Sequence, residues 1–208
     1  MKTVKVNTLG AFFAATAVWA LIFCATAYAA APEEILRVSL NKGLEVLKNK
    51  ELSAPEKSEQ RKKALREIAE KIFDFEEMSK RTLAMHWKQR SREEQAEFVI
   101  LFKDFLAGVY TGKIERYGDE DVRYLAENIE GEYSIVKTNV INKENLSIPI
   151  DYKLIARNGD WKVYDVIIEG VSLVNNYRNQ FNQIIRTKSY RELVKMLKEK
   201  QAIPLEKK

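Results

Sequence analysis

The sequence predicts an α+β domain, in which a curved antiparallel sheet of four strands is covered by helices from both ends of the chain. The first observation is the spacing of the apolar residues. They recur with a helical period as far as about residue 116, with a period of two residues from residue 121 to 168, and with a helical period again beyond residue 172. The second is the short connections between the strands, which favour an antiparallel meander. With 208 residues, 46% of them hydrophobic, the chain can bury one real core.

Residues 1–29 have the pattern of a secretory signal peptide. Lys2 and Lys5 precede an uncharged stretch from residue 9 to residue 27, and Ala27-Tyr28-Ala29 matches the small-residue cleavage site of such peptides. An uncleaved membrane anchor is the alternative, because the uncharged stretch is longer than a usual signal core. We therefore expect residues 30–208 to form a single domain.

Four helical stretches are expected before the sheet. One face of the first carries Leu36, Leu40, Leu44 and Leu47, and one face of the second, after a start signal at residues 53–56, carries Leu65, Ile68, Ala69 and Ile72. A third stretch covers residues 75–87, and Ser91 with Glu94 forms a capping box for a fourth helix that extends to about residue 116. Apolar side chains cover more than one stripe of the fourth helix, so we expect it to be buried between layers.

Four strands follow. Val122, Tyr124 and Ala126 alternate with polar residues in the first, and residues 133–141 form a second rich in β-branched residues. The third has the cleanest alternation, and its buried face consists of Leu146, Ile148, Ile150, Tyr152, Leu154 and Ala156. Asn158-Gly159 then predicts a two-residue hairpin turn into the fourth strand.

The fourth strand, within the segment "GDWKVYDVIIEG", is apolar on both faces. Strict alternation places Trp161, Val163 and Ile167 on one face and Tyr164, Val166 and Ile168 on the other. Helices can cover one face, and either more protein or a bound ligand must cover the other. Beyond Gly170, two amphipathic helices close the chain, the second starting at Ser189.

Few residues offer chemistry. The chain has one histidine, His86, which we expect to be a packed or half-exposed helix residue, and one cysteine, Cys24, inside the predicted signal peptide. Without Lys2 and Lys5, 33 basic and 30 acidic residues remain, a net charge of +3 that is too balanced for a nucleic-acid-binding protein. We expect no enzyme, no metal site and no cofactor, because nucleophile, base and ligand clusters are missing from the sequence.

Asp165 is the acid that we expect inside the sheet. A buried carboxylate is costly unless it is paired, so Arg81, Arg178 or Arg186 should lie beside it. The alternative is a polar anchor at the mouth of a ligand cavity.

Two regions resemble a known family. The segments "WKVYDVIIEGVSLVNNYRNQF" and "IIRTKSYRELVKMLKEK" resemble the carboxy-terminal signature of the MlaC family, also called the toluene-tolerance Ttg2 family. The upstream stretch "FDFEEMSKRTLAMHWKQRSREEQAEFVILFKDFLAGVYTGKIERYG" is similar to the other marker of that family. The resemblance extends from about Phe73 to Lys200 and therefore covers most of the predicted domain.

This resemblance implies a periplasmic phospholipid carrier that holds acyl chains in a deep apolar cavity of an NTF2-like cup. It also implies the partners, an outer-membrane lipoprotein–porin complex and an inner-membrane MCE-domain ABC transporter complex, between which lipid is shuttled to maintain outer-membrane lipid asymmetry. We expect the cavity wall to consist of large apolar residues, namely Phe98, Leu101, Phe102, Phe105, Val109, Tyr164, Ile167, Val171, Val174, Tyr177 and Phe181.

Two alternatives stay open, because a pattern does not distinguish a filled core from a cavity. One is an NTF2-like binding protein or enzyme for another small apolar ligand. The other is a periplasmic interaction module with a solid core.

Overall fold

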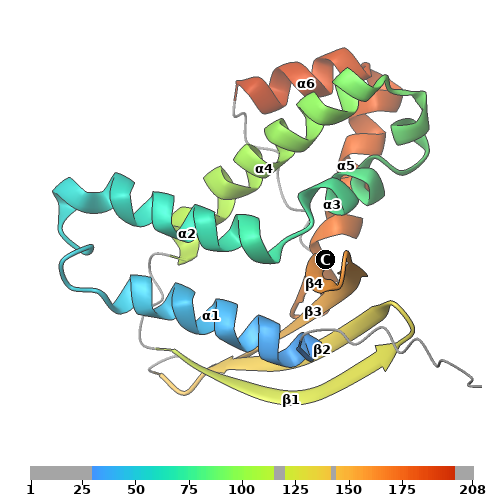
Figure 1. Ribbon diagram of the computed structural model, residues 1–208. Helices are drawn as coiled ribbons and strands as arrows, with labels where there is room; N and C mark the ends of the chain where they lie inside the picture. The colour runs from blue at the N-terminus through green and yellow to red at the C-terminus, as the bar shows by residue number, and fades with distance from the viewer. Residues whose placement is uncertain (1–29, 115–119, 142–143, 200–208) are drawn as a thin grey trace, which may run out of the picture.

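The computed structural model describes residues 30–114, 120–141 and 144–199, and the predicted signal peptide lies outside these ranges. A curved antiparallel sheet forms the base of the molecule, and two groups of helices lie above it (Figure 1). One group is the hairpin of α1 (Pro32–Lys48) and α2 (Ser58–Ile72), joined through the short 3₁₀ helix η1 (Pro55–Lys57). The other group contains α3 (Phe75–Leu83), the 3₁₀ helix η2 (Ala84–Gln89), α4 (Arg92–Ile114), α5 (Leu173–Thr187) and α6 (Tyr190–Lys198). The predicted α+β class is confirmed.

The sheet has the strand order β1-β2-β3-β4-β5, and every neighbouring pair is antiparallel. The strands are β1 (Asp121–Glu130), β2 (Tyr133–Ile141), β3 (Ser147–Arg157), β4 (Asp160–Ile168) and β5 (Val171–Ser172). The short β5 is a strand more than the sequence predicts. It forms because Glu169 and Gly170, at φ 49° and 80°, make a tight turn that folds the chain back onto β4.

The predicted hairpin turn between β3 and β4 is confirmed. Asn158 and Gly159 have φ of 52° and 82°, the left-handed conformation that a type I′ turn requires at both central residues. Among the described helices, none is both long and apolar enough to cross a membrane.

The second group of helices encloses an aromatic core. Phe98 and Phe102 of α4 and Tyr177 and Phe181 of α5 are completely buried. Their rings meet edge to face, with centroids 5.9 Å apart for Phe98 and Phe181 and 5.8 Å apart for Phe102 and Tyr177. Edge-to-face contacts between rings add to the stability of the fold beyond the contribution of the buried area. This part of the molecule is therefore a closely packed core.

Helix α4 begins at the predicted capping box. The Ser91 amide donates to Glu94 Oε2 at 2.9 Å, and the Glu94 amide donates to Ser91 Oγ at 3.2 Å. The expectation that α4 is enclosed between layers is wrong, because Ile100 is 57% exposed and only one side of the helix faces the core. Its carboxy-terminal end, with Tyr110 and Ile114, reaches beyond the aromatic core toward α1 and α2.

A β-bulge interrupts the alternation that the sequence predicts for β4. Lys153 pairs with Asp165 and Leu154 with Val163, so Tyr164 is an extra residue in β4. The predicted division of faces is therefore wrong beyond Val163. The structure gathers Trp161, Val163, Val166 and Ile168 on the face toward α1 and α2, and Tyr164 packs against the helical core.

Asp165 is buried, as predicted, but the prediction of an arginine partner is wrong. The carboxylate instead accepts a hydrogen bond from Ser172 Oγ at 2.7 Å and one from the Val174 amide at 3.1 Å. The first amides of a helix have no partner inside the helix, and the positive end of the helix dipole lies there too. The start of α5 therefore stabilises the Asp165 carboxylate without a cation. The bulge at Tyr164 and this pair of bonds together position α5 on the sheet.

A second buried carboxylate joins α3 to the sheet. Glu77 is 5% exposed and accepts hydrogen bonds from Arg81 Nε at 2.7 Å, from Arg157 Nη2 of β3 at 2.9 Å and from Lys80 Nζ at 3.2 Å. Burial by itself would raise the pKa of Glu77, but the hydrogen bond from Lys80 and the charges of Arg81 and Lys80 outweigh burial and lower the pKa.

Candidate binding cavity

An apolar cavity lies between the α1–α2 hairpin and the face of the sheet toward the helices. Its main lobe has a volume of about 660 Å³. A smaller lobe of about 330 Å³ lies between α2 and α4, and the two adjoin because residues such as Leu40, Phe73 and Ile150 line both. A dry cavity of about 150 Å³ already holds a benzene molecule, so the main lobe has room for a much longer hydrocarbon.

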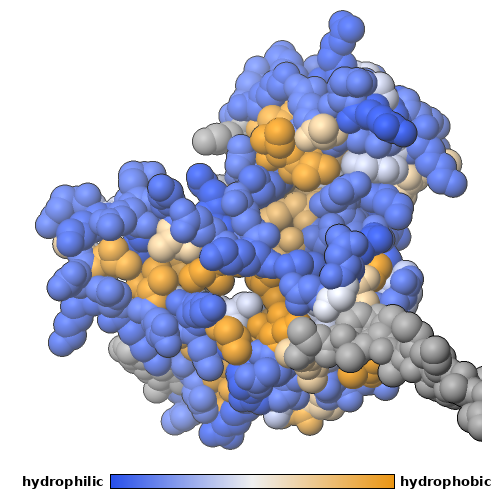
Figure 2. Space-filling view, in the orientation of Figure 1, coloured by the Kyte–Doolittle hydropathy of each residue, from blue (hydrophilic) through white to orange (hydrophobic). Residues whose placement is uncertain are grey.

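Aliphatic side chains from two helices and the sheet form most of the main lobe. They are Leu36, Leu40, Leu44 and Leu47 of α1, Leu65, Ile68 and Ile72 of α2, and Val122, Val140, Ile148, Ile150, Val163 and Ile168 of the sheet. Only Leu36, Ile72 and Val163 among them are buried, because the others face a hollow. In Figure 2, apolar residues appear along the cleft between α1 and α2.

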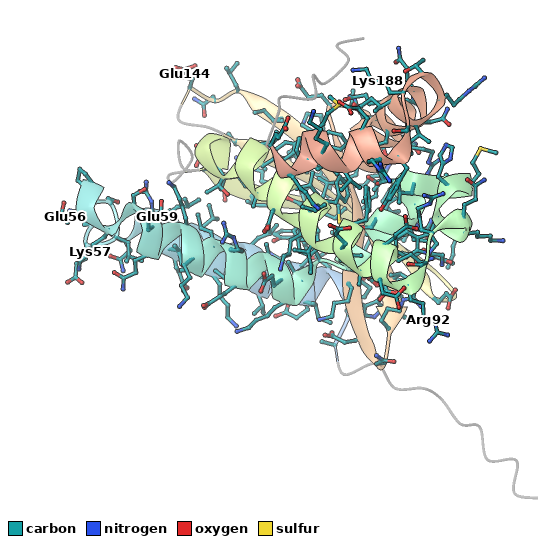
Figure 3. The ribbon with its side chains drawn as sticks, turned by 90° about the horizontal axis from the view of Figure 1, so that it is seen from above. Glu56, Lys57, Glu59, Arg92, Glu144 and Lys188 are labelled. Carbon is teal, nitrogen blue, oxygen red and sulfur yellow. The ribbon has the colours of Figure 1, made fainter. Side chains whose placement is uncertain are left out.

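The cavity stays open because the hairpin is fastened to the sheet at one end. At the start of α1, the Arg37 guanidinium stacks 3.7 Å from the centre of the Tyr124 ring of β1. At the end of α2, Phe73 bridges to Val163 of β4, and the next amide, that of Asp74, donates to the Val163 carbonyl at 2.8 Å. The opposite end, where Glu56, Lys57 and Glu59 are labelled, projects away from the helical core (Figure 3).

Polar side chains are few on the cavity wall. Among the described residues of the main lobe, the charged or amide side chains are those of Glu120, Glu169 and Asn176. The Ser39 hydroxyl, also on this wall, donates to the Ile35 carbonyl at 2.9 Å. The smaller lobe has Arg66 and an ion pair between Lys103 Nζ and Glu70 Oε1, 2.7 Å apart. Tyr110 and Tyr152 line both lobes, and burial raises the pKa of each phenol. A wall of this kind suits hydrocarbon with few directed contacts.

His86 lies outside both lobes. It is half-buried in η2, as predicted for a helix residue, with its Nε2 3.0 Å from Asn182 Oδ1.

Among the eleven residues that the sequence suggests for the wall, the structure places Val171 on the main lobe. Leu101, Val109 and Tyr164 are partly buried against the helical core, and Ile167 pairs with Ser172 in the sheet. The other six are buried inside the helical core, namely Phe98, Phe102, Phe105, Val174, Tyr177 and Phe181. Contact of the eleven residues with a ligand stays a prediction.

The leucines of α1 and α2 line the main lobe, although the wall predicted from the sequence does not include them. A signal for them was present, because residues 32–72 contain no Phe, Tyr or Trp, the side chains that fill most space. Gly43, in the middle of α1, is a second signal, since a glycine inside a helix costs stability. It lines the main lobe, and a Cβ added there would meet nothing within 4 Å.

The helix-covered antiparallel sheet and its aliphatic cavity together define a class of protein, an α+β fold that encloses an apolar cavity. The chain belongs to the MlaC family, because the family model, described as MlaC protein, matches residues 38–199. The resemblance found in the sequence is thereby confirmed.

Two relatives accompany this match. Toluene tolerance protein ttg2D of Pseudomonas putida is 26% identical over 120 residues, which cover 57% of this chain and only 56% of the relative. Among solved structures, a phospholipid-binding protein from Ralstonia solanacearum, determined in complex with a phospholipid, is similar with a TM-score of 0.74. The two chains share the fold at 23% identity, over 82% of this chain and 97% of the other.

Proposed function

We propose that this protein is a periplasmic phospholipid carrier that holds acyl chains in the cavity between the α1–α2 hairpin and the sheet. The observation that carries the proposal is the main lobe, with about 660 Å³ of space behind aliphatic walls. Membership of the MlaC family supports it, as does the shared fold with a protein that was determined with a phospholipid bound.

The energetics of lipid transfer favour a deep cavity over a surface groove. At about 0.8 kcal/mol per buried CH₂, a sixteen-carbon chain gains about 12 kcal/mol in a membrane. A carrier must offer comparable apolar contact, which requires walls on several sides of the chain. Helix α1, helix α2 and the sheet supply three such walls, and the cleft between α1 and α2 supplies a route of entry.

The cargo passes between two membrane complexes in this proposal. They are an outer-membrane lipoprotein–porin complex and an inner-membrane MCE-domain ABC transporter complex, and the transfer maintains the lipid asymmetry of the outer membrane. A carrier is needed because exposed acyl chains are strongly disfavoured in the water between the membranes. The protein acts by binding and release, and catalysis has no part in the proposal.

Native mass spectrometry tests the proposal. The full coding sequence is expressed in a bacterium, the protein is purified without detergent, and the lipids of the same sample are extracted. We expect adducts with phospholipid masses and one stoichiometric lipid class in the extract. A protein without adducts that also takes no lipid from vesicles would refute the carrier and favour an interaction module.

A further inference from the structure

Basic residues gather in two segments of the chain that contain no acid. Residues 78–92 and 170–191 together contain nine Lys or Arg and no Asp or Glu, so 26 basic and 30 acidic residues are left for the rest of the chain. The first segment covers the end of α3, η2 and the first residue of α4, and the second covers β5, α5 and the start of α6. The positive excess of the protein therefore comes from these two segments.

The two segments meet where η2 packs along α5. Asn182 Oδ1 of α5 lies 3.0 Å from His86 Nε2 of η2. Arg186, which is exposed, is one helical turn beyond Asn182 on the same side of α5. Just after η2, the Arg90 guanidinium stacks 4.5 Å from the centre of the Tyr190 ring, at the start of α6. These contacts join the two segments into one continuous basic surface.

Part of this positive charge is neutralised within the fold, because Glu77 and Glu94 each form ion pairs with basic residues of the first segment. Lys88 of η2 and Lys188, which follows α5, are exposed instead. Figure 3 shows Lys188 and Arg92 on opposite sides of one end of the molecule, away from the tip of the α1–α2 hairpin. This end of the molecule therefore presents positive charge to the solvent.

An apolar side chain projects from the same surface. Met85 of η2 is 70% exposed, the largest exposed fraction among the large hydrophobic residues that the structure describes. Residues three apart in a 3₁₀ helix lie above each other, so Met85 and Lys88 share the outer side of η2. The residue before Met85, Ala84, has a φ of 49°, a conformation that costs free energy for a residue with a Cβ. The fold therefore holds an apolar side chain in the solvent beside cations, at a strained position of the backbone.

We propose that this η2 surface, formed by Met85, Lys88, Arg92, Arg186 and Lys188, docks on anionic phospholipid bilayers. The cations lie at the lipid phosphates and the Met85 side chain enters the headgroup layer. A specific protein interface has a core of several buried apolar side chains, whereas dispersed cations around one apolar side chain match a bilayer surface. The inference goes beyond the carrier function, because these five side chains lie outside both lobes of the cavity.

Vesicle flotation tests the proposal. The purified protein is mixed with vesicles of phosphatidylcholine alone or of equal parts of phosphatidylcholine and phosphatidylglycerol, at low and at high salt, and the fraction that floats with the vesicles is measured. We expect the anionic vesicles to bind the protein at least about tenfold more tightly than the neutral ones, because each Lys or Arg near an anionic surface contributes about fivefold in affinity. High salt should abolish the difference, because it screens exposed charges.

Two variants and a matched control locate the binding surface. Lys88→Gln combined with Lys188→Gln removes two exposed charges, and the affinity for anionic vesicles should fall about 25-fold. Met85→Ser keeps the charge and should lower the same affinity about fivefold. Lys50→Gln combined with Lys57→Gln removes the same charge from the opposite end of the molecule and should leave the affinity within about twofold of the wild type. Circular dichroism should show all three proteins folded.

Three results would overturn the inference. They are equal binding to neutral and anionic vesicles, an unchanged affinity after the substitutions at Lys88 and Lys188, and an equal loss in the control at Lys50 and Lys57, which would mean that only net charge matters. Isolated bacterial membranes distinguish a protein partner. Binding to these membranes that protease treatment abolishes, without binding to the pure-lipid vesicles, would overturn the inference in favour of an acidic protein surface.

Discussion

A substitution at Gly43 that fills the main lobe tests whether the lobe is a ligand site or an empty space without function. Gly43 lies in the interior of α1 and lines the main lobe, and a Cβ there meets nothing within 4 Å. Gly108, in α4, also has open space around a built Cβ, but it is exposed and outside both lobes. The two glycines therefore form a matched pair for substitution.

The stability effects should be alike at both positions. Replacing a helix-interior glycine by alanine gains about 1 kcal/mol, so Gly43→Ala and Gly108→Ala should each raise the melting temperature by about 2–4 °C. Gly43→Trp should fold as well as Gly108→Trp, because its Cβ meets nothing within 4 Å and its ring can extend into the main lobe.

The lipid effects should differ. An indole is larger than benzene, which by itself fits a cavity of about 150 Å³, so the ring takes up a substantial part of the main lobe's 660 Å³. Even if the acyl chain rearranges and loses contact for only two CH₂ groups, the loss is about 1.6 kcal/mol, which is more than tenfold in affinity. Native mass spectrometry should show Gly43→Trp depleted of lipid and Gly108→Trp loaded like the wild type.

The refuting result is a fully loaded Gly43→Trp protein with an unchanged circular dichroism spectrum. It would mean that hydrocarbon is bound elsewhere, for example among the aromatic residues that the sequence suggested. Equal depletion in Gly108→Trp would point to a general effect of an added tryptophan and would also refute the reasoning.

Three further expectations concern single side chains. Val171→Glu places a charge on the wall of the main lobe. We expect native mass spectrometry to show at least a tenfold loss of co-purified lipid while the protein stays folded. A normal lipid content would contradict the placement of Val171 on the lipid-binding wall. Asp165→Ala leaves the Ser172 hydroxyl and the Val174 amide without their acceptor. Urea unfolding should show that the free energy of unfolding falls by about 3 kcal/mol. A fall of under about 1 kcal/mol would mean that these hydrogen bonds are dispensable. Because the pKa of Glu77 is lowered on folding, its contribution to stability is present above about pH 4.3 and is lost as the pH falls through the folded-state pKa. Thermal melts should show Glu77→Gln destabilised by about 3 kcal/mol at neutral pH but less sensitive to acid than the wild type, and parallel pH profiles would contradict that role.

The features that the sequence predicts correctly are local. The capping box of Ser91 and Glu94 and the turn at Asn158-Gly159 depend on residues within four positions of each other, so their chemistry can be read directly. The helices and strands follow from periodicity for the same reason. The partner of Asp165 was missed because it depends on the Tyr164 bulge, an extra residue that periodicity does not reveal.

The order of helices and strands, the α+β class and the family follow from the sequence, because they depend on local periodicity and on short sequence motifs. The tertiary structure alone decided which apolar faces meet. The aromatic residues of α4 and α5 pack against each other and fill their space, whereas the leucines of α1 and α2 face a hollow. In the sequence, an apolar stripe has the same pattern whether it packs against protein or faces a cavity. The reason is that the free energy gained when apolar side chains leave water is similar for protein and for lipid neighbours. Whether a neighbour is present depends on where the hairpin is fastened to the sheet, and only contacts distant in sequence determine that position.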